Sequence, residues 1–400
     1  MLAWMRAGAL AALALFAAAA DAPARTVRWA ASGDPNTLDP HSQNVGTVTM
    51  VLQQIYEGLV TRNPDLSPAP GLATSWSQEE PTRWRFNLRP GVRFHNGEPF
   101  TAEDVVFSFA RAQQPTSNFG IFVDTIDRAV AVDERTVDIV TKVPDPILPN
   151  KLPSVYIMSK SWAERHNATR PQNTRAREEM HTVRNTNGTG PYILKTWEPD
   201  KRIVFEAFKG WWDKLPGNAT EVVYTPIKSD ATRVSALLAG DVDLVTDVPT
   251  QDVERLKREP KLKVVDGHEV RTIFIGMDQH REELQYSNVK GKNPFKDVRV
   301  RKALNMSVDR EAIRRVTMRG LSIPAGIMVA PGVHGHSKEI DKVLKYDPAG
   351  AKKLLAEAGY PDGFEFTLDC PNNRYVNDEK ICQALVGMWA KAGIRARLNS

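Results

Sequence analysis

After residue 24, apolar and polar residues recur along this chain with two different periods. Apolar residues at every second position predict strands, and apolar residues three or four apart predict amphipathic helices. The predicted strands lie at residues 27–30, 84–88, 130–132, 137–139, 192–197, 203–207, 222–227, 262–265, 364–368 and 394–398. The predicted helices lie at residues 45–59, 101–109, 229–238, 250–257, 297–304, 347–358 and 381–392. The alternation of strands and helices in the second half is typical of an α/β domain with a largely parallel sheet.

Local signals mark several ends of these elements. Thr101 and Asp104 have the spacing of a capping box at the start of a helix. Gly240, Gly359 and Gly393 follow predicted helices, where glycine commonly ends a helix. Residues 165–190 are rich in Arg, Asn and Thr and poor in apolar residues. We expect this polar segment to be a surface loop near a domain boundary.

The N-terminus has the pattern of a secretory signal peptide. Arg6 precedes an apolar run over residues 7–20, which ends with small residues at positions 18–20. An alternative cleavage site follows residues 22–24. The run is shorter than the roughly 20 apolar residues that span a bilayer, and no cysteine follows it to carry a lipid. We therefore expect a periplasmic protein released by cleavage after residue 20, or as late as residue 24.

Composition and charge narrow the function classes. A chain of 400 residues predicts two or three domains. The formal net charge is +5, and the Lys and Arg residues are scattered along the chain and form no continuous basic stretch. A nucleic-acid partner is therefore not expected. The chain lacks a phosphate-binding loop and a nucleophile elbow. We expect no enzyme activity, no cofactor and no resident metal.

Cys370 and Cys382 are the only cysteines of the chain. An oxidising compartment permits a bridge between them. Two partly buried free thiols are the favoured interpretation, and a disulfide is the alternative.

Several stretches of the chain, in this order, resemble the family 5 extracellular solute-binding proteins, which include dipeptide, oligopeptide and nickel binders. They are residues 34–40, 56–59, 72–76, 86–97, 100–108, 189–192, 240–244, 294–304, 347–348 and 354–361. The resemblance implies an α/β, two-lobe periplasmic binding protein fold of type II with an additional subdomain on the first lobe. It places lobe I at residues 25–45 and 187–268, the subdomain at 46–186 and lobe II at 269–400. It also implies that lobe II is truncated at residue 400, since the family extends further.

The same resemblance suggests residues that contact the solute. Dipeptide binders of this family place an Arg and a Tyr ahead of a helix with Trp-Ala-Lys, and the Arg pairs with the solute carboxylate. Here Arg374 and Tyr375 precede residues 389–391, without the family's intervening Pro. The loop of Thr37, Leu38 and Asp39 is a second candidate near the crevice between the lobes. A turn that only connects a strand to a helix explains that loop equally well.

The function implied is capture of short peptides or similar solutes for an ABC importer, with its permease and ATPase as partners. A nickel or metal-chelate binder and a sugar binder on the same fold are the alternatives. A periplasmic hydrolase is a further alternative, disfavoured by the missing catalytic motifs.

Overall fold

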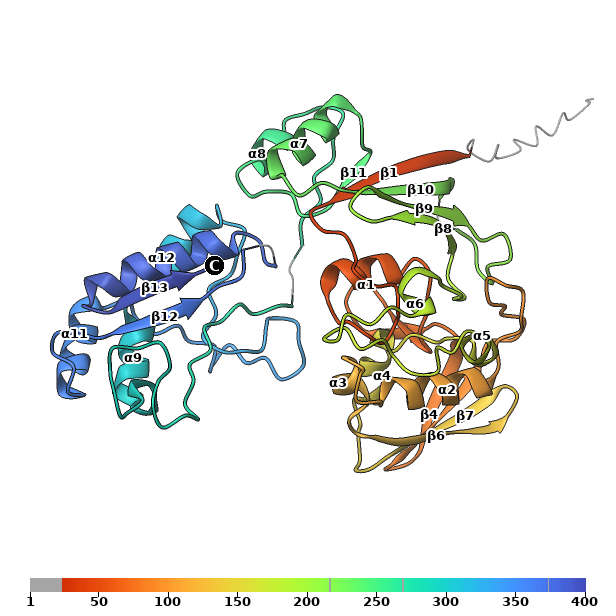
Figure 1. Ribbon diagram of the computed structural model, residues 1–400, viewed down its shortest axis with the longest axis horizontal. Coiled ribbons are helices and arrows are strands. Elements are labelled where there is room, and N and C mark those ends of the chain that lie inside the picture. Colours follow the sequence, from red (N-terminus) through yellow and green to blue (C-terminus); the bar gives the residue numbers. More distant parts are fainter. Residues whose placement is uncertain (1–23, 216, 268–269, 373) are drawn as a thin grey trace, which may run out of the picture. The chain divides into compact units, whose positions relative to one another are not determined.

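The computed structural model describes residues 24–215, 217–267, 270–372 and 374–400 (Figure 1). These residues form two compact units, and each is described by itself. Unit 1 comprises residues up to 228 and residues 235–245, and unit 2 comprises residues 229–234 and 246–400. The expected signal peptide at residues 1–20 and the expected lobe boundary at 268/269 lie outside the described residues. The domain limits stay a prediction.

Unit 1 contains most of the strands. Its strands are β1 (Arg25–Ala31), β2 (Val60–Arg62), β3 (Pro68–Pro70), β4 (Ala73–Glu80), β5 (Arg83–Leu88), β6 (Ile126–Asp133), β7 (Thr136–Thr141), β8 (Tyr192–Glu198), β9 (Arg202–Ala207), β10 (Ala219–Pro226) and β11 (Leu244–Val245). Its helices are α1 (Gly46–Leu52), α2 (Ala102–Ala112), α3 (Gly120–Val123), α4 (Leu148–Lys151), a 3-10 turn (Leu152–Ser154), α5 (Lys160–Arg165) and α6 (His181–Arg184). Helix α7 (Asp230–Ala239) contributes residues to both units.

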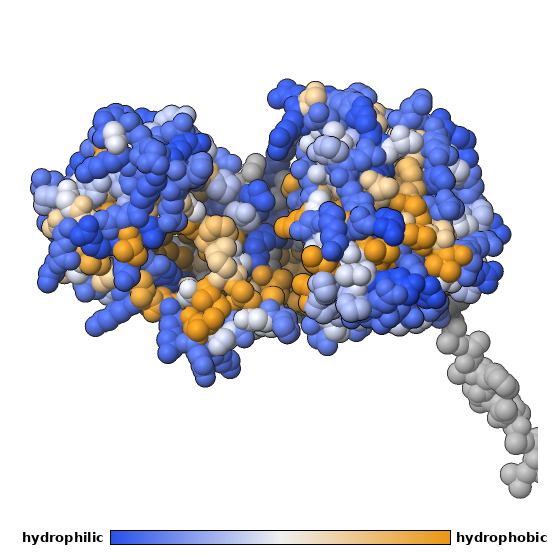
Figure 2. Space-filling model, turned by 90° about the horizontal axis from the view of Figure 1, so that it is seen from below, coloured by the Kyte–Doolittle hydropathy of each residue, from blue (hydrophilic) through white to orange (hydrophobic). Residues whose placement is uncertain are grey.

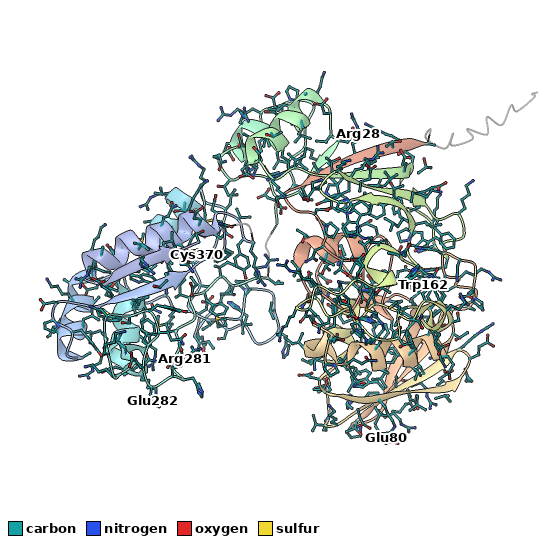
Figure 3. The ribbon with its side chains drawn as sticks, in the orientation of Figure 1. Arg28, Glu80, Trp162, Arg281, Glu282 and Cys370 are labelled. Atoms are coloured by element: carbon teal, nitrogen blue, oxygen red, sulfur yellow. A yellow bond between two sulfur atoms is a disulfide. The ribbon has the colours of Figure 1, made fainter. Side chains whose placement is uncertain are left out.

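One sheet of unit 1 has the strand order β11-β1-β10-β9-β8. Strand β1 runs parallel to β10 and β11, whereas β10, β9 and β8 pair antiparallel. The sheet is therefore mixed: β10, β1 and β11 form its parallel part, and β8, β9 and β10 form an antiparallel part because they follow one another without an intervening helix. Asp243, just before β11, binds the backbone N–H and the guanidinium of Arg28, which Figure 3 labels on β1. This contact holds the short β11 at the sheet edge.

The second sheet of unit 1 is antiparallel, in the order β4-β5-β7-β6. The strands predicted at residues 130–132 and 137–139 are confirmed and form the antiparallel hairpin of β6 and β7, against which helix α2 packs. The predicted capping box of α2 is confirmed too, since Asp104 accepts the backbone N–H of Thr101 at 2.9 Å. The buried face of α2 contributes Val105 and Phe109 to an apolar core that extends to β1, β9 and β10.

Unit 2 is built around a β-α-β segment. Strand β12 (Glu365–Asp369), helix α12 (Asp378–Lys391) and strand β13 (Arg395–Asn399) follow one another, and the two strands pair in parallel. The other elements are α8 (Val253–Leu256), a 3-10 turn (Pro294–Lys296), α9 (Val298–Met306), α10 (Arg310–Ala312), a π-helical turn (Ile313–Thr317) and α11 (Pro348–Glu357). Trp389 of α12 is fully buried in the core of this unit and donates to the carbonyl of Leu304.

Asp297 and Asp347, the first residues of two predicted helices, cap α9 and α11. The Asp297 side chain accepts the N–H of Arg299, and the Asp347 side chain accepts the N–H of Gly350. Each carboxylate thereby satisfies an N–H group that has no partner inside its helix.

Three predicted elements differ from the structure. The helix expected over residues 45–59 ends at Leu52, although Ile55 and Leu59 are still buried. Residues 262–265 form no strand, and Val265 is 79% exposed. They have no neighbouring strand among the described residues, and a strand needs one to satisfy its backbone. The polar segment at 165–190 contains α6, and Thr182 and Thr189 are fully buried.

The face of the molecule shown in Figure 2 is mostly hydrophilic, with apolar side chains gathered in patches. In unit 2, the apolar residues of the segment from 316 to 344 are largely exposed: Val316, Leu321, Ile323, Met328, Val333, Ile340, Val343 and Leu344. Among the described residues, no helix is apolar over a length that would cross a membrane.

Candidate functional site: the loop between β12 and α12

The loop that carries Arg374 and Tyr375 joins the end of β12 to the start of α12. Arg374 is exposed and Tyr375 is half-buried. The buried Asp378 holds the backbone of both, because its Oδ2 accepts the N–H of Arg374 at 2.9 Å and of Tyr375 at 3.1 Å. Its Oδ1 accepts the N–H of Glu379 at 2.9 Å. Both oxygens of Asp378 are thus engaged by the backbone, and the carboxylate supports the loop.

Asn377 fixes the end of the same loop. Its φ of +57° lies in the left-handed region, which asparagine tolerates better than most residues. The side-chain amide donates to the hydroxyl of Thr250 at 2.8 Å and to the carbonyl of Thr317 at 3.0 Å. The loop is therefore attached to two other segments of unit 2.

A disulfide joins Cys370, which Figure 3 labels, to Cys382 across this loop. The favoured expectation of two free thiols is wrong. Cys370 directly follows β12, and Cys382 is on the buried face of α12. Packing of the helix brings the two Cα atoms to 6.5 Å, within the range that a disulfide spans. The bridge confines Arg374 and Tyr375 to a short closed loop.

Two arginines contact the ring of Tyr375. The guanidinium carbon of Arg374 is 5.4 Å from the ring centroid, and that of Arg271 is 5.5 Å from it. Both distances are within the range of a cation–π contact. Arg374 has no carboxylate within ion-pair distance among the residues that the structure describes. Arg271 was not identified from the sequence, since it lies about 100 positions away and only the fold brings it to Tyr375.

The second candidate loop, of Thr37, Leu38 and Asp39, is in the interior of unit 1. All three side chains are fully buried. Two nitrogens of the Arg111 guanidinium bind the two carboxylate oxygens of Asp39, and the Thr182 hydroxyl donates to Asp39 at 2.7 Å. The side chains present no surface to a solute here, which favours the alternative of a connecting turn. A role of these residues in solute contact stays a prediction.

Electrostatics explain why Asp39 is stable as a buried charge. Burial opposes ionisation, but the charge and hydrogen bonds of Arg111 and the bond from Thr182 hold the pKa of Asp39 well below its usual value. Burial, together with the nearby Arg111 charge, lowers the pKa of His41 to about 3. His41 therefore stays neutral, donating to the carbonyl of Tyr156 and accepting from Arg111.

A signal for this cluster is present in the sequence, although it was missed. Asp104, Ser108 and Arg111 recur at helical spacing on the same side of α2 as the apolar residues. Polar residues on an apolar helix face need buried partners. Asp104 accepts the N–H of Lys160 at 2.9 Å, and Arg111 donates to the carbonyls of Ala168 and Arg170. The polar segment at 165–190 therefore supplies backbone acceptors to the buried Arg111.

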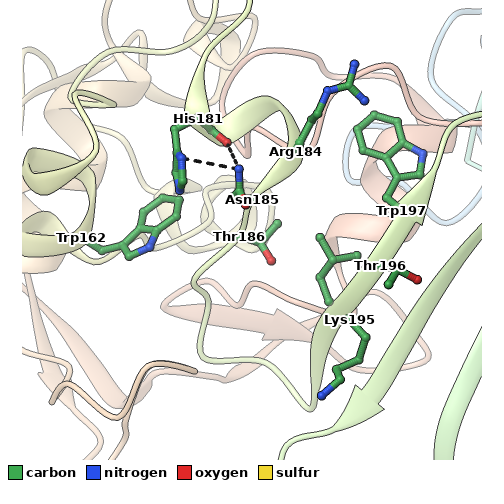
Figure 4. A pocket seen from close by; sticks show the side chains of 9 residues that line it. Trp162, His181, Arg184, Asn185, Thr186, Lys195, Thr196 and Trp197 are labelled. Carbon is green, nitrogen blue, oxygen red and sulfur yellow. Dashed lines mark hydrogen bonds between the residues drawn. The ribbon is translucent and has the colours of Figure 1, made fainter.

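Unit 1 also has a polar cavity of about 260 Å³ (Figure 4). Its walls are Trp162, His181, Arg184, Asn185, Thr186, Leu194, Lys195, Thr196 and Trp197. Asn185 donates to the carbonyl of His181 at 3.0 Å. Arg184 pairs with Glu179 and Lys195 pairs with Glu206, so the cations of the wall are already paired. In the described part of the chain, no group of three or more His, Cys, Asp or Glu side chains could hold a metal ion.

The sequence profile of the bacterial extracellular solute-binding proteins, family 5, matches residues 67–400. The chain belongs to this family. It is 29% identical over 399 residues to the glutathione-binding protein GsiB of Salmonella typhi. The alignment covers 98% of this chain and 73% of that protein. GsiB of Escherichia coli O1:K1 is 28% identical over 394 residues, covering 97% and 72%.

Solved structures agree with this assignment. AgaA of A. tumefaciens R10, in complex with agropinic acid, is 27% identical with a TM-score of 0.76, covering 94% of this chain and 72% of that one. DppA of Helicobacter pylori, an ABC transporter-associated periplasmic binding protein in complex with the peptide STSA, is 24% identical with a TM-score of 0.80, covering 94% and 73%. At that identity the likeness to DppA shows the fold. The expected periplasmic binding protein fold is thereby confirmed.

Proposed function

We propose that this family 5 protein is the periplasmic solute-binding component of an ABC importer that captures short peptides or similar small solutes. It delivers them to an inner-membrane permease with its ATPase, and it leaves them chemically unchanged. The relatives' names support a peptide-like solute, since GsiB is a glutathione-binding protein and DppA was solved with a peptide.

One observation supports a solute that has a terminal carboxylate. Arg374 exposes a guanidinium without a protein carboxylate among the described residues, on a loop held by Asp378, Asn377 and a disulfide. A guanidinium fork matches two carboxylate oxygens, and a fixed backbone reduces the entropy lost on binding. We assign Arg374 to the terminal carboxylate of the solute and the half-buried Tyr375 ring to the adjoining wall.

Calorimetry of the protein with reduced glutathione and with tripeptides tests this assignment. Arg374→Ala should weaken binding by about 2–5 kcal/mol, the cost of removing one partner of a desolvated ion pair. Arg374→Lys should recover only part of the affinity, because an ammonium lacks the two-pronged geometry.

Solute variants provide the matched control. A tripeptide with a C-terminal amide should bind the unmodified protein weakly, and Arg374→Ala should lower that residual affinity little further. Equal binding of acid and amide would show that Arg374 does not bind the carboxylate. Conversion of a bound peptide to products would contradict the assignment as a binding protein.

A further inference from the structure

The loop that carries Arg374 is held by two kinds of contact. Asp378 and the disulfide join residues of the loop and of α12 to one another, so they set the internal shape of the loop. Asn377 instead joins the loop to segments far away in the sequence, because its side-chain amide donates to Thr250 and to Thr317. The shape of the loop and its place in unit 2 therefore depend on different side chains.

The amide of Asn377 is engaged at both of its ends. Its nitrogen carries two hydrogens, and it donates to the Thr250 hydroxyl at 2.8 Å and to the Thr317 carbonyl at 3.0 Å. Its oxygen accepts from the ammonium group of Lys380 at 3.2 Å. Thr250 is buried, and Thr317 ends the π-helical turn, where a carbonyl lacks a partner within its own helix. These contacts give the amide one orientation and fix the end of the loop.

We propose that Asn377 is a positioning residue for solute binding, which holds Arg374 where its guanidinium meets the terminal carboxylate of the solute. This inference rests on the proposed function and adds a residue that acts through Arg374.

The short distance along the chain supports this role. Arg374 lies three positions before Asn377, and Asp378 binds its backbone N–H. A displacement of Asn377 is therefore passed on to Arg374, because the loop between them is held by the same carboxylate. A guanidinium that is fixed before the solute arrives loses less entropy on binding.

Asn377→Gly tests the role, because glycine adopts the left-handed backbone of this position without strain and removes only the side chain. Calorimetry measures the affinities for trialanine and for its C-terminal amide, and their ratio is the acid preference. The acid preference should fall roughly tenfold, the effect of one to two neutral hydrogen bonds. The affinity for the amide should not change. A role in stability alone would weaken the binding of acid and amide equally.

A second variant leaves the left-handed residue in place. Thr250→Val keeps the size of a buried side chain and removes the hydroxyl that accepts from Asn377. It should lower the acid preference by a smaller factor, since the bond to Thr317 remains. The combined variant Asn377→Gly with Thr250→Val should lower it no further than Asn377→Gly alone, because both changes remove the same hydrogen bond.

Two controls make the result specific. In the Arg374→Ala background, Asn377→Gly should cause no further loss of affinity for the acid, because the group that it positions is gone. Asn167→Gly changes an exposed asparagine of unit 1 whose φ of +53° is also left-handed, and it should leave both affinities unchanged. A thermal melt of each variant verifies folding, and Thr250→Val decides the test if Asn377→Gly does not fold.

The outcomes separate the two proposals. If the unmodified protein prefers the acid and both Asn377→Gly and Thr250→Val retain the full preference, the inference about Asn377 is wrong and the proposed function stands. The same conclusion follows if Asn377→Gly weakens acid and amide equally. If the unmodified protein binds neither these peptides nor glutathione, the proposed function fails, and the inference fails with it.

Discussion

Asp39 and Arg111 form an ion pair in which neither side chain has any exposed surface. Asp39 follows β1 and Arg111 is on α2, so the pair connects the start of unit 1 to the helix that covers its second sheet. Thr182 and the N–H of Gln172 also bind Asp39, which adds the polar segment to the same contact. A charge this deeply buried is tolerated only while its partners remain.

Removing one member of this pair should destabilise unit 1 strongly. Arg111→Met leaves a buried carboxylate without its cation, which should cost about 3–5 kcal/mol of unfolding free energy. Chemical denaturation followed by circular dichroism measures the loss. The control is Glu80→Gln, at an exposed pair with Arg83 in the same unit, where the change should stay below about 1 kcal/mol.

The double variant Arg111→Met with Asp39→Leu should lose less than the two single variants together, since no uncompensated charge remains. Strict additivity of the two losses would contradict the coupling of Asp39 with Arg111.

Low pH should destabilise unit 1, because the buried His95 stays neutral in the folded state. Burial lowers the pKa of His95 to about 4, and its Nε2 lies 2.9 Å from the carbonyl of Gly190. As the pH falls from about 6.5 to 4, the unfolded chain binds a proton at this histidine and the folded chain does not. The contribution of His95 to the free energy of unfolding is thus fully present above pH 6.5. It falls by on the order of 2–3 kcal/mol between pH 6.5 and pH 4.

His95→Gln keeps a donor for Gly190 and removes the titration. Its melting temperature should fall less between pH 7 and pH 4 than that of the unmodified protein, as measured by differential scanning calorimetry. His334→Gln, at an exposed histidine, is the matched control, and its curve should follow the unmodified one. Parallel curves for all three proteins would exclude His95 as a source of the acid sensitivity.

Loss of the disulfide should destabilise unit 2 and weaken solute binding. The bridge joins residues 12 positions apart, and closing a loop of this size stabilises a fold by about 3 kcal/mol. Replacing Cys370 and Cys382 by Ser should cost about that much, and it frees the loop that holds Arg374. Denaturant titration measures the first effect and calorimetry with a peptide the second.

Reduction of the unmodified protein should reproduce the behaviour of the double serine variant, and the same reductant should leave that variant unchanged. Two free thiols in protein taken from the periplasm, detected by alkylation and mass spectrometry, would contradict the bridge.

Export should remove the first 20 to 24 residues. The apolar run and the small residues at positions 18–20 predict a mature N-terminus near Asp21 or Arg25. Mass spectrometry of protein from a periplasmic extract identifies it. An intact Met1 on a membrane-associated product would contradict both the signal peptide and the periplasmic location.

The sequence by itself determined the elements whose signals are local. Thr101 and Asp104 predicted the start of α2, and the alternation of residues 364–368 predicted β12. The helices predicted to begin at residues 297 and 347 are α9 and α11. Each signal depends on backbone groups or side chains within a few residues, so it can be recognised without knowing the fold. The family is likewise indicated by the sequence, because its motifs are short runs of residues that follow one another in a fixed order.

Only the tertiary structure decided which distant residues meet. Gly188 shows why, since a Cβ there would lie 2.0 Å from the carbonyl oxygen of Ile55, a contact invisible in the local sequence. The Cys370–Cys382 bridge, the Asp39–Arg111 pair and the contact of Arg271 with Tyr375 have the same origin. Such contacts depend on how helices pack on sheets, and the spacing of residues along the chain does not encode the partner.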